Sequence, residues 1–251
     1  MAFPQERRRR ILQLLEEGGS ARTVELQQAL GVSIATVRRD LEELAQQTLI
    51  ERTHGGALWR ALGTAYEPSF ALKSKRMREQ KERIAEAAAR LVSAGVTVLL
   101  DSGTTTLALA RQLAGKPITL IALDLPTAQA AAAGQTEVLL IGGRVRNGFF
   151  SLVGPWAEET LRGLNADLFF LAADAVDDET VTNSTVEEAA VKRLGIRAAR
   201  EAVLVADHSK FGRRALAQVC RIEELSAVIT DGGIGAHEAV LRERVKRVVI
   251  A

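Results

Sequence analysis

The stretch GVSIATVRRDLEEL, residues 31–44, determines how the N-terminal part of the chain folds. Gly31 predicts a tight turn after a short helix. Ser33 predicts the start of the next helix, because a serine side chain accepts a hydrogen bond from the first helical N–H groups. An apolar helical pattern in residues 6–16 adds another helix in front. Two helices joined by a glycine-containing turn match the helix–turn–helix motif that reads DNA.

The helix that follows Ser33 has an apolar face and a polar face. At about 100° per residue, the side chains predicted to face the core are Ile34, Val37, Leu41 and Leu44. The candidate DNA contacts on the remaining surface are Ser33, Ala35, Thr36, Arg38 and Arg39. Arg39 projects away from the core and can bind O6 and N7 of guanine together, whereas Arg38 is better placed for phosphate. The alternative is a solvated face on which both arginines pair with Glu42 and Glu43.

A hairpin is predicted directly after this helix. Leu49–Thr53 has the pattern of a strand, His54-Gly55-Gly56 that of a turn, and Ala57–Trp59 that of a return strand. A hairpin in this place turns a helix–turn–helix into a winged helix. The wing would bring Arg52 and His54 close to the DNA backbone or the minor groove.

Two runs in this part of the chain carry a family resemblance. VSIATVRRDL at 32–41 and IERTHGGA at 50–57 resemble the DNA-binding signature of the DeoR family of bacterial repressors. The resemblance implies that the partner is double-stranded operator DNA. One departure is Thr48, where the family commonly has glycine before the wing.

The rest of the chain alternates short apolar runs with amphipathic stretches. The apolar runs predict seven strands, at 96–100, 118–123, 137–141, 167–172, 202–206, 226–230 and 247–250. Helical patterns lie between most of them, as at Thr105–Leu113, Trp156–Leu164 and Val186–Arg200. This alternation predicts an α/β domain with a parallel sheet covered on both faces. Ligands of such sheets bind outside the carboxyl ends of the strands.

We expect three parts along the chain. Residues 1–59 form the winged helix–turn–helix domain, 60–83 a basic linker, and 84–251 an α/β domain for effector sensing and oligomerisation. The linker has seven basic and three acidic residues, whereas residues 1–59 have eight of each. Net charge therefore does not mark the DNA-binding surface, and a basic footprint must come from local placement.

Polar and small residues follow five of the predicted strands. The sharpest of these segments is SGTTT at 102–106, which ends a strand and begins a helix. Its hydroxyls and the free N–H groups at the helix start suit a phosphate; the alternative is that they cap the helix without a ligand. Asp174, Asp207 and Lys210 follow other strands. Together they predict a site for a small polyhydroxylated anion.

The resemblance to the DeoR family extends into this domain. LLDSGTTT at 99–106, LLIGGRV at 139–145, EEAAVKR at 187–193 and VADHSKFG at 205–212 are similar to its sensor domain. That domain shares its fold with sugar-phosphate isomerases and senses phosphorylated metabolites. Carried over by position, the implied effector-binding residues are Ser102, Gly103, Thr104, Thr105, Gly142, Gly143, Asp174, Asp207 and Lys210.

The family pattern is broken at three places. Ala122-Leu123 stand where the family usually has Thr-Asn, Ala172 and Ala175 where it often has glycine, and Thr180 in place of a common glycine. These departures leave open that the effector is unusual or that effector binding has been lost.

Composition excludes several classes of protein. The chain of 251 residues is 47% hydrophobic and 25% charged, as in ordinary globular proteins. No apolar run approaches the roughly 20 residues of a membrane span, and the N-terminus lacks the apolar stretch of a secretory signal, so we expect a cytoplasmic protein. Cys220 is the only cysteine and the three histidines are scattered, so we expect no metal and no cofactor.

The leading interpretation is a transcriptional repressor of a carbohydrate-metabolism operon, without catalytic residues, released from its operator by a phosphorylated sugar. We expect a homodimer or homotetramer, because two linked modules are needed to read repeated half-sites. One alternative is a sugar-phosphate isomerase using acid and base groups among Asp174, Asp177, Asp178, Glu179 and Lys210. The other is a transcriptional regulator that is an activator or has no effector.

Overall fold

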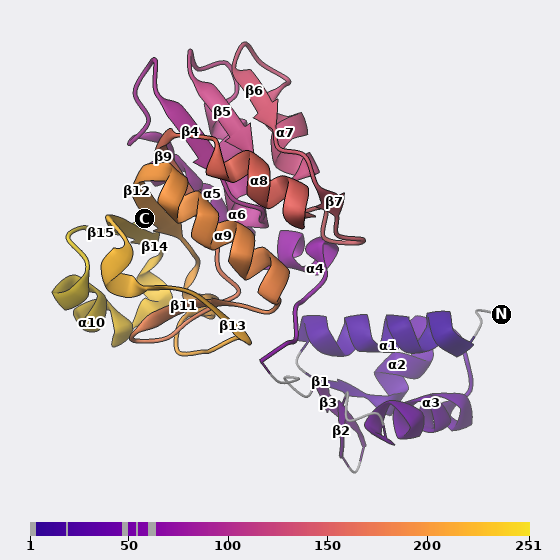
Figure 1. The fold of residues 1–251 in the computed structure, drawn as a ribbon. Coiled ribbons are helices and arrows are strands. Elements are labelled where there is room, and N and C mark those ends of the chain that lie inside the picture. The colour runs from indigo at the N-terminus through magenta and orange to yellow at the C-terminus, as the bar shows by residue number, and fades with distance from the viewer. Residues whose placement is uncertain (1–3, 19, 47–49, 54, 60–63) are drawn as a thin grey trace. The chain divides into compact units, whose positions relative to one another are not determined.

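The structure is a computed structural model that describes residues 4–18, 20–46, 50–53, 55–59 and 64–251. It divides into two compact units, Met1–Tyr66 and Glu67–Ala251 (Figure 1).

The first unit consists of three helices and a small antiparallel sheet. The helices are α1 (Pro4–Gly18), α2 (Thr23–Leu30) and α3 (Ile34–Gln46), and the strands are β1 (Ser20–Arg22), β2 (Ile50–Thr53) and β3 (Gly56–Trp59). The strand order is β1-β3-β2. The predicted helix–turn–helix and hairpin are confirmed. Strand β1 was not predicted, because three residues carry no readable alternation.

Local signals set the turn between α2 and α3. Gly31 ends α2 in the left-handed region, at φ 63°, and its N–H donates to the carbonyl of Gln27. Glycine adopts this conformation without the steric penalty that a side chain brings. Ser33 Oγ accepts a hydrogen bond from the N–H of Thr36 at 3.2 Å, as the predicted helix start requires.

The core of the first unit differs from the predicted apolar face of α3 in one residue. Val37, Leu41 and Leu44 are buried, but Ile34 is 39% exposed. Ile34 is the first residue of α3, so it lies at the edge of the helix contact. Asp40 is buried instead, because Arg7 of α1 supplies it with a charged partner.

The second unit is built on a seven-stranded parallel sheet. Its strands are β4 (Thr97–Leu100), β5 (Thr119–Ala122), β6 (Glu137–Leu140), β9 (Ala166–Leu171), β12 (Ala199–Val205), β14 (Ala227–Thr230) and β15 (Val248–Ile250). All six neighbouring pairs are parallel, in the order β15-β14-β12-β9-β4-β5-β6. Each of the seven predicted strands is present, so the predicted fold class is confirmed.

Helices cover both faces of this sheet (Figure 1). Consecutive strand residues point to opposite faces: Phe169 packs with Ala157 of α8 (Pro155–Arg162) and Ala189 of α9 (Val186–Ala198). Phe170 packs on the other side, in a cluster with Ile84 of α5 and Leu109 of α6. The other helices of the described chain are α4 (Phe70–Lys75), α5 (Arg78–Ala89), α6 (Thr104–Leu113), α7 (Leu125–Ala131) and α10 (His237–Arg244).

Short elements surround the main sheet. They are the hairpin β7 (Arg144–Val145) and β8 (Leu152–Val153), the antiparallel sheet of β10 (Ala175–Val176), β11 (Thr180–Asn183) and β13 (Ala217–Arg221), and the 3-10 turns η1 (His208–Lys210), η2 (Ile222–Glu224) and η3 (Gly232–Ile234). Helix α4 and the first half of α5 lie in the stretch that the sequence predicts as a linker, and they belong to the second unit. The bounds of a linker stay a prediction.

The order of the strands in the main sheet indicates where a ligand would bind. It reverses between β4, the first strand of the sheet along the chain, and β9, the fourth. At such a reversal the connections leave in opposite directions and open a crevice at the carboxyl ends of the strands. Among the described residues, no helix combines the length and the apolar character that crossing a membrane requires.

Candidate functional site

The exposed surface of α3 carries most of the predicted DNA contacts. Ser33, Ala35, Arg38 and Arg39 are exposed and Thr36 is partly exposed. Arg52 of β2 is also exposed, and its Nη1 donates to the carbonyl of Arg38 at 3.2 Å, which ties the wing to α3. His54 lies outside the described residues, as does Thr48. DNA contact by these residues stays a prediction.

The paired-charge alternative for this face has little support. Glu43 is bound by Arg8 of α1, with Nη2 and Oε2 2.6 Å apart. Within the part of the chain that the structure describes, neither Arg38 nor Arg39 forms an ion pair. Both guanidinium groups are therefore available for an external anion or base.

A pocket lies at the strand-order reversal of the second unit. Six of the nine predicted effector-binding residues line it, namely Ser102, Gly103, Thr104, Thr105, Asp174 and Lys210. The predicted set missed Glu67, Phe70, Lys73, Lys81, Phe149, Asn183, Glu188 and Lys192, which also line it. The space enclosed among these side chains is about 30 Å³.

Three predicted residues are not part of the lining of this pocket. Gly143 has φ 139°, and a Cβ there would lie 3.1 Å from the Val153 carbonyl, so this glycine serves the packing of the β7–β8 hairpin. Gly142 precedes it. The Asp207 carboxylate accepts hydrogen bonds from the N–H and hydroxyl of Ser209, which fixes turn η1.

The SGTTT segment presents fewer free N–H groups than its sequence suggests. The N–H of Ser102 donates to Asp101 Oδ1 at 2.8 Å, and that of Gly103 donates to Asp124 Oδ2 at 3.0 Å. Two carboxylates thus hold the start of the segment. The N–H groups of residues 104–106, in the first turn of α6, have no intrahelical acceptor and remain for an anion.

A buried ion pair holds the floor of the pocket. Lys192 of α9 donates to the Asp101 carboxylate after β4 and to the Ala172 carbonyl after β9. Both charged side chains are almost fully buried. Burial lowers the pKa of Lys192, but the carboxylates of Asp101 and Glu188 outweigh it and hold the pKa above its ordinary value. The pair therefore fixes the two strand ends that meet at the reversal.

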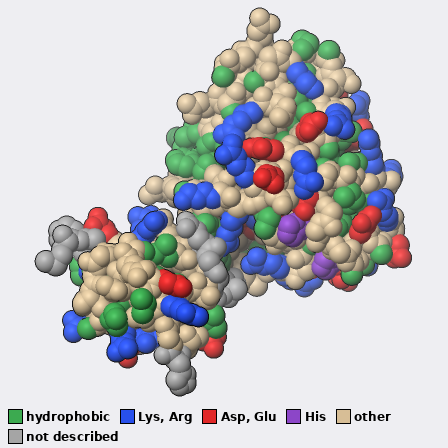
Figure 2. Space-filling model, turned by 180° about the vertical axis from the view of Figure 1, so that it is seen from behind, with side chains coloured by type: hydrophobic (Ala, Val, Ile, Leu, Met, Phe, Trp, Pro, Cys, Tyr) green, Lys and Arg blue, Asp and Glu red, His purple; other side chains and the backbone are tan. Residues whose placement is uncertain are grey.

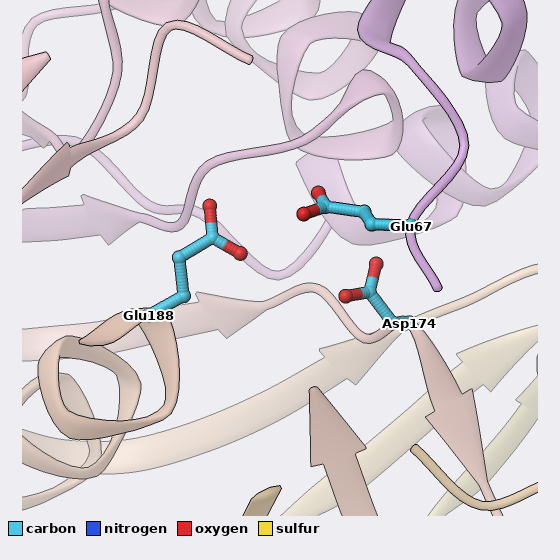
Figure 3. A group of neighbouring side chains, drawn as sticks. All are labelled: Glu67, Asp174 and Glu188. Carbon is cyan, nitrogen blue, oxygen red and sulfur yellow. The ribbon is translucent and has the colours of Figure 1, made fainter. Parts of the chain in front are cut away.

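Three carboxylates converge inside the pocket (Figure 3). Oxygens of Glu67, before α4, of Asp174, after β9, and of Glu188, on α9, all lie within 4.8 Å of one another. Lys73 Nζ is 2.8 Å from Glu67 and 3.8 Å from Asp174. Arg146, in the β7–β8 hairpin, is 2.8 Å from Glu67 and 2.5 Å from Glu188. Carboxylates this close could share a cation, and these two side chains provide positive charge there.

The charges in the pocket set the ionisation of Asp174. Burial raises its pKa, but Lys73 and Lys210 outweigh it and lower the pKa to about 2. Its Oδ2 accepts a hydrogen bond from the N–H of Ser184 at 3.0 Å. Asp174 is thus a permanent carboxylate that can accept hydrogen bonds from ligand hydroxyls.

Lys81 of α5 is a pocket residue that the sequence analysis placed in the linker. It is 5% exposed, and its Nζ donates to the carbonyls of Lys73 and Arg76 at 2.5 and 2.6 Å. Burial, reinforced by Lys210 and Lys73 and opposed by Asp207, lowers its pKa to about 8. The signal that could have identified Lys81 is its spacing of three and four residues from Ile84 and Ala85. This spacing places Lys81 on the buried, apolar face of the helix.

Comparison with known families identifies both units. Residues 7–60 match the DeoR-like helix-turn-helix domain, and residues 76–232 match the DeoR C terminal sensor domain. The chain belongs to the DeoR family. It is a DNA-binding transcriptional regulator with a sensor domain, as the resemblance in its sequence implied.

Individual relatives of this DeoR-family chain match over nearly their whole length. The HTH-type transcriptional regulator GlpR of Haloferax volcanii is 38% identical over 237 residues, 93% of this chain and 92% of its own. The lactose phosphotransferase system repressor of Staphylococcus aureus is 34% identical over 229 residues, 90% of this chain and 91% of its own. Among solved structures, ribose 5-phosphate isomerase A of Methanocaldococcus jannaschii aligns with a TM-score of 0.41 and 19% identity, covering 53% of this chain and 54% of its own.

One departure from the DeoR pattern has a clear structural place. Ala122 and Leu123, where the family usually has Thr-Asn, are 0% and 1% exposed. Ala122 belongs to the core on the α5 and α6 side of the sheet, and Leu123 to the core on the α8 and α9 side. Neither residue lines the pocket.

Proposed function

We propose that this DeoR-family regulator is a repressor of a carbohydrate-metabolism operon, released from its operator by a phosphorylated sugar bound in the pocket between β4 and β9. The observation that carries the proposal is the joint presence, in one pocket, of a helix start with free N–H groups and of several buried charged side chains. The relative named as a repressor of a lactose phosphotransferase system supports a phosphorylated sugar.

The pocket offers different chemistry to the two ends of such a ligand. The first turn of α6 supplies N–H groups, and Lys81 and Lys210 supply positive charge, for the phosphate. The carboxylates of Asp174 and Glu188 supply hydrogen-bond acceptors for the sugar hydroxyls. The remaining predicted residues, Gly142, Gly143 and Asp207, act through the shape of neighbouring loops in this proposal.

Thermal shifts test this proposal. Sugar phosphates and their free sugars are compared in pairs on the wild-type protein and on Lys210→Ala and Thr104→Val. A phosphorylated sugar at about 100 times its Kd should stabilise the fold by roughly 2.7 kcal/mol, and both variants should lose that shift while still binding operator DNA. Lys246→Ala removes an exposed lysine and is the control. A shift that survives both variants places the ligand elsewhere, and no shift with any phosphate favours a regulator without an effector.

We also propose that the chain assembles into a dimer or tetramer through the second unit. Six large hydrophobic side chains between residues 125 and 156 are exposed, namely Leu125, Leu139, Leu140, Val145, Phe150 and Trp156. Strand β6 is the edge of the sheet, and Figure 2 shows hydrophobic side chains gathered on the side of this unit where β6 and α7 lie in Figure 1. Exposed apolar surface next to a free strand edge is typical of an interface.

Light scattering of the full chain tests the assembly. The wild-type protein should be a dimer or tetramer at micromolar concentration, and Leu139→Glu with Leu140→Glu should shift it toward the monomer. A strict monomer that still binds one half-site tightly would exclude this proposal. Since the partner is chromosomal DNA, we place the protein in the cytoplasm.

We propose no catalytic role for the pocket. Among the carboxylates that the sequence offers as a base, Asp174 has a pKa of about 2, far below the working pH at which a general base must act. Asp177 is paired with Arg214 and Asp178 with His237, and neither lines the pocket. Turnover of a sugar phosphate by the purified protein, followed by NMR, would revive the enzyme alternative.

A further inference from the structure

The pocket as it stands is too small for the ligand proposed above. Its enclosed space of about 30 Å³ has room for one or two water molecules. Sites for small molecules commonly have volumes of about 300–1,000 Å³. A sugar phosphate can therefore enter only after some of the lining side chains have moved.

The lining groups differ in how firmly they are held. Asp101 and Lys192 are fixed by a buried ion pair and by backbone hydrogen bonds at two strand ends. Glu67 comes from the segment before α4, outside the sheet, and its side chain is only 5% exposed. It forms ion pairs with Lys73 and Arg146. Glu67 thus occupies the pocket through its carboxylate, much as a ligand would.

The charges favour Glu67 as the group that leaves. It is the third carboxylate within 4.8 Å of Asp174 and Glu188, and like charges this close repel. Burial raises the pKa of Glu67, and the two neighbouring carboxylates add to the rise against the opposing effect of Lys73. After Glu67 leaves, Lys73 still faces Asp174 at 3.8 Å and Arg146 still binds Glu188 at 2.5 Å.

We propose that Glu67 is a built-in occupant of the effector pocket, whose carboxylate the hydroxyl-bearing end of the effector displaces. The neutral hydroxyls then bind the cations and carboxylates that Glu67 leaves behind. Displacement of the Glu67 carboxylate removes one negative charge from the pocket, and the phosphate of the effector adds negative charge to it. This inference rests on the proposed function, and it adds the step by which ligand binding changes the protein.

The position of Glu67 in the chain gives the displacement a consequence. Glu67 is the first residue of the second unit, directly after Tyr66, which ends the DNA-binding unit. A displacement of Glu67 that involves its backbone acts directly on the covalent connection between the two units. The effector signal therefore leaves the sensor domain through the covalent connection itself.

Glu67→Gln tests the inference because it removes the charge and keeps the size of the side chain. Glu82→Gln is the matched control: it removes the same charge from an exposed pair with Arg78, 2.9 Å away. Calorimetric titrations use glycerol 3-phosphate, ribose 5-phosphate and glucose 6-phosphate on all three proteins. The compound that binds wild type should bind Glu67→Gln at least tenfold more tightly, because less of the binding energy goes into opening the pocket. The control should stay within about twofold.

Hydrogen exchange provides a second measurement that does not depend on DNA. Adding the bound compound to wild type should raise amide exchange in residues 66–70. Equal affinities for wild type and Glu67→Gln, without this change, would overturn the inference and leave the proposed function standing. Weaker binding by Glu67→Gln would make Glu67 a ligand contact and also overturn it. If none of the three compounds binds either protein, the proposed function and this inference both fail.

Discussion

Arg7 on α1 and Asp40 on α3 form an ion pair in the interior of the DNA-binding unit. Arg7 Nη2 donates to Asp40 Oδ1 at 3.1 Å, and Asp40 is 1% exposed. The pair joins the first helix to the helix that carries the candidate DNA contacts. Removing one partner of a buried pair leaves the other charge buried and unpaired, which costs more than the pair itself contributes.

Arg7→Met is therefore expected to destabilise the DNA-binding unit by about 3 kcal/mol. Hydrogen exchange of the α3 amides in the full chain measures this loss. Arg10→Met is the control, because Arg10 is exposed and donates a hydrogen bond to the neutral side chain of Gln13 at 3.2 Å. Equal protection of α3 in both variants would show that Arg8, 3.4 Å from Asp40, is a sufficient partner.

Arg39 and Arg38 are predicted to bind DNA in different ways. Arg39→Ala should weaken binding to the true operator by about 1–3 kcal/mol and have much less effect on random DNA, since a base contact is lost. Arg38→Ala should weaken binding to both DNAs about equally, since a phosphate contact is lost. Fluorescence anisotropy at one fixed salt concentration measures both. Identical losses for the two variants on both DNAs would refute the assignment.

Gly56 in the wing is predicted to tolerate no side chain. A Cβ on Gly56 would lie 2.1 Å from the carbonyl oxygen of Ala21 in β1, and no rotamer change relieves a clash between backbones. Gly56→Ala should cost about 1–3 kcal/mol or more and separate β1 from β3. Gly55→Ala is the control, because a Cβ there meets nothing within 4 Å. Urea unfolding compares the two, and equal stabilities would mean that β1 does not pair with β3 in solution.

The main sheet could be predicted because its central strands are buried on both faces. Strands of this kind are continuous apolar runs, such as Val98 to Leu100, and stand out from the polar stretches between them. The strand ends in turn predicted Ser102 to Thr105 and Asp174 as pocket residues. Strands β1 and β7, of three and two residues, have no such signal.

The missed half of the pocket comes from segments whose place the sequence does not reveal. Glu67 and Lys73 precede the sheet in a stretch that composition marks as a linker, and Arg146 belongs to a short hairpin. Only the fold brings them to the ends of β4 and β9. Asp40 was missed for a related reason: periodicity places charged residues outside, and its partner Arg7 lies 33 positions away.

The ionisation of Lys81 gives a final prediction, on how effector binding depends on pH. The pKa of Lys81 is lowered to about 8, mainly by burial. The second ionisation of a phosphate ester, near pKa 6, is nearly complete at pH 7, so the charge of the ligand is almost constant above that pH. An anion binds more tightly to the protonated amine. The Kd for a phosphorylated sugar should therefore rise by up to about fivefold between pH 8 and pH 9, because the protonated fraction of Lys81 falls from about one half to about one tenth.

Lys81→Arg should remove this dependence, because arginine stays charged throughout the range, and titration calorimetry at pH 7, 8 and 9 compares the two proteins. The stability of the fold depends on pH in the opposite direction to the affinity for the ligand, which falls as pH rises. The unfolded chain, with an ordinary lysine, binds more protons between about pH 8 and pH 10.5, so the contribution of Lys81 to stability increases as pH rises through that window. A wild-type Kd that does not change from pH 7 to pH 9 would show that Lys81 is not near the bound phosphate. A rise that persists in Lys81→Arg would assign the titration to Lys210, whose pKa burial also lowers.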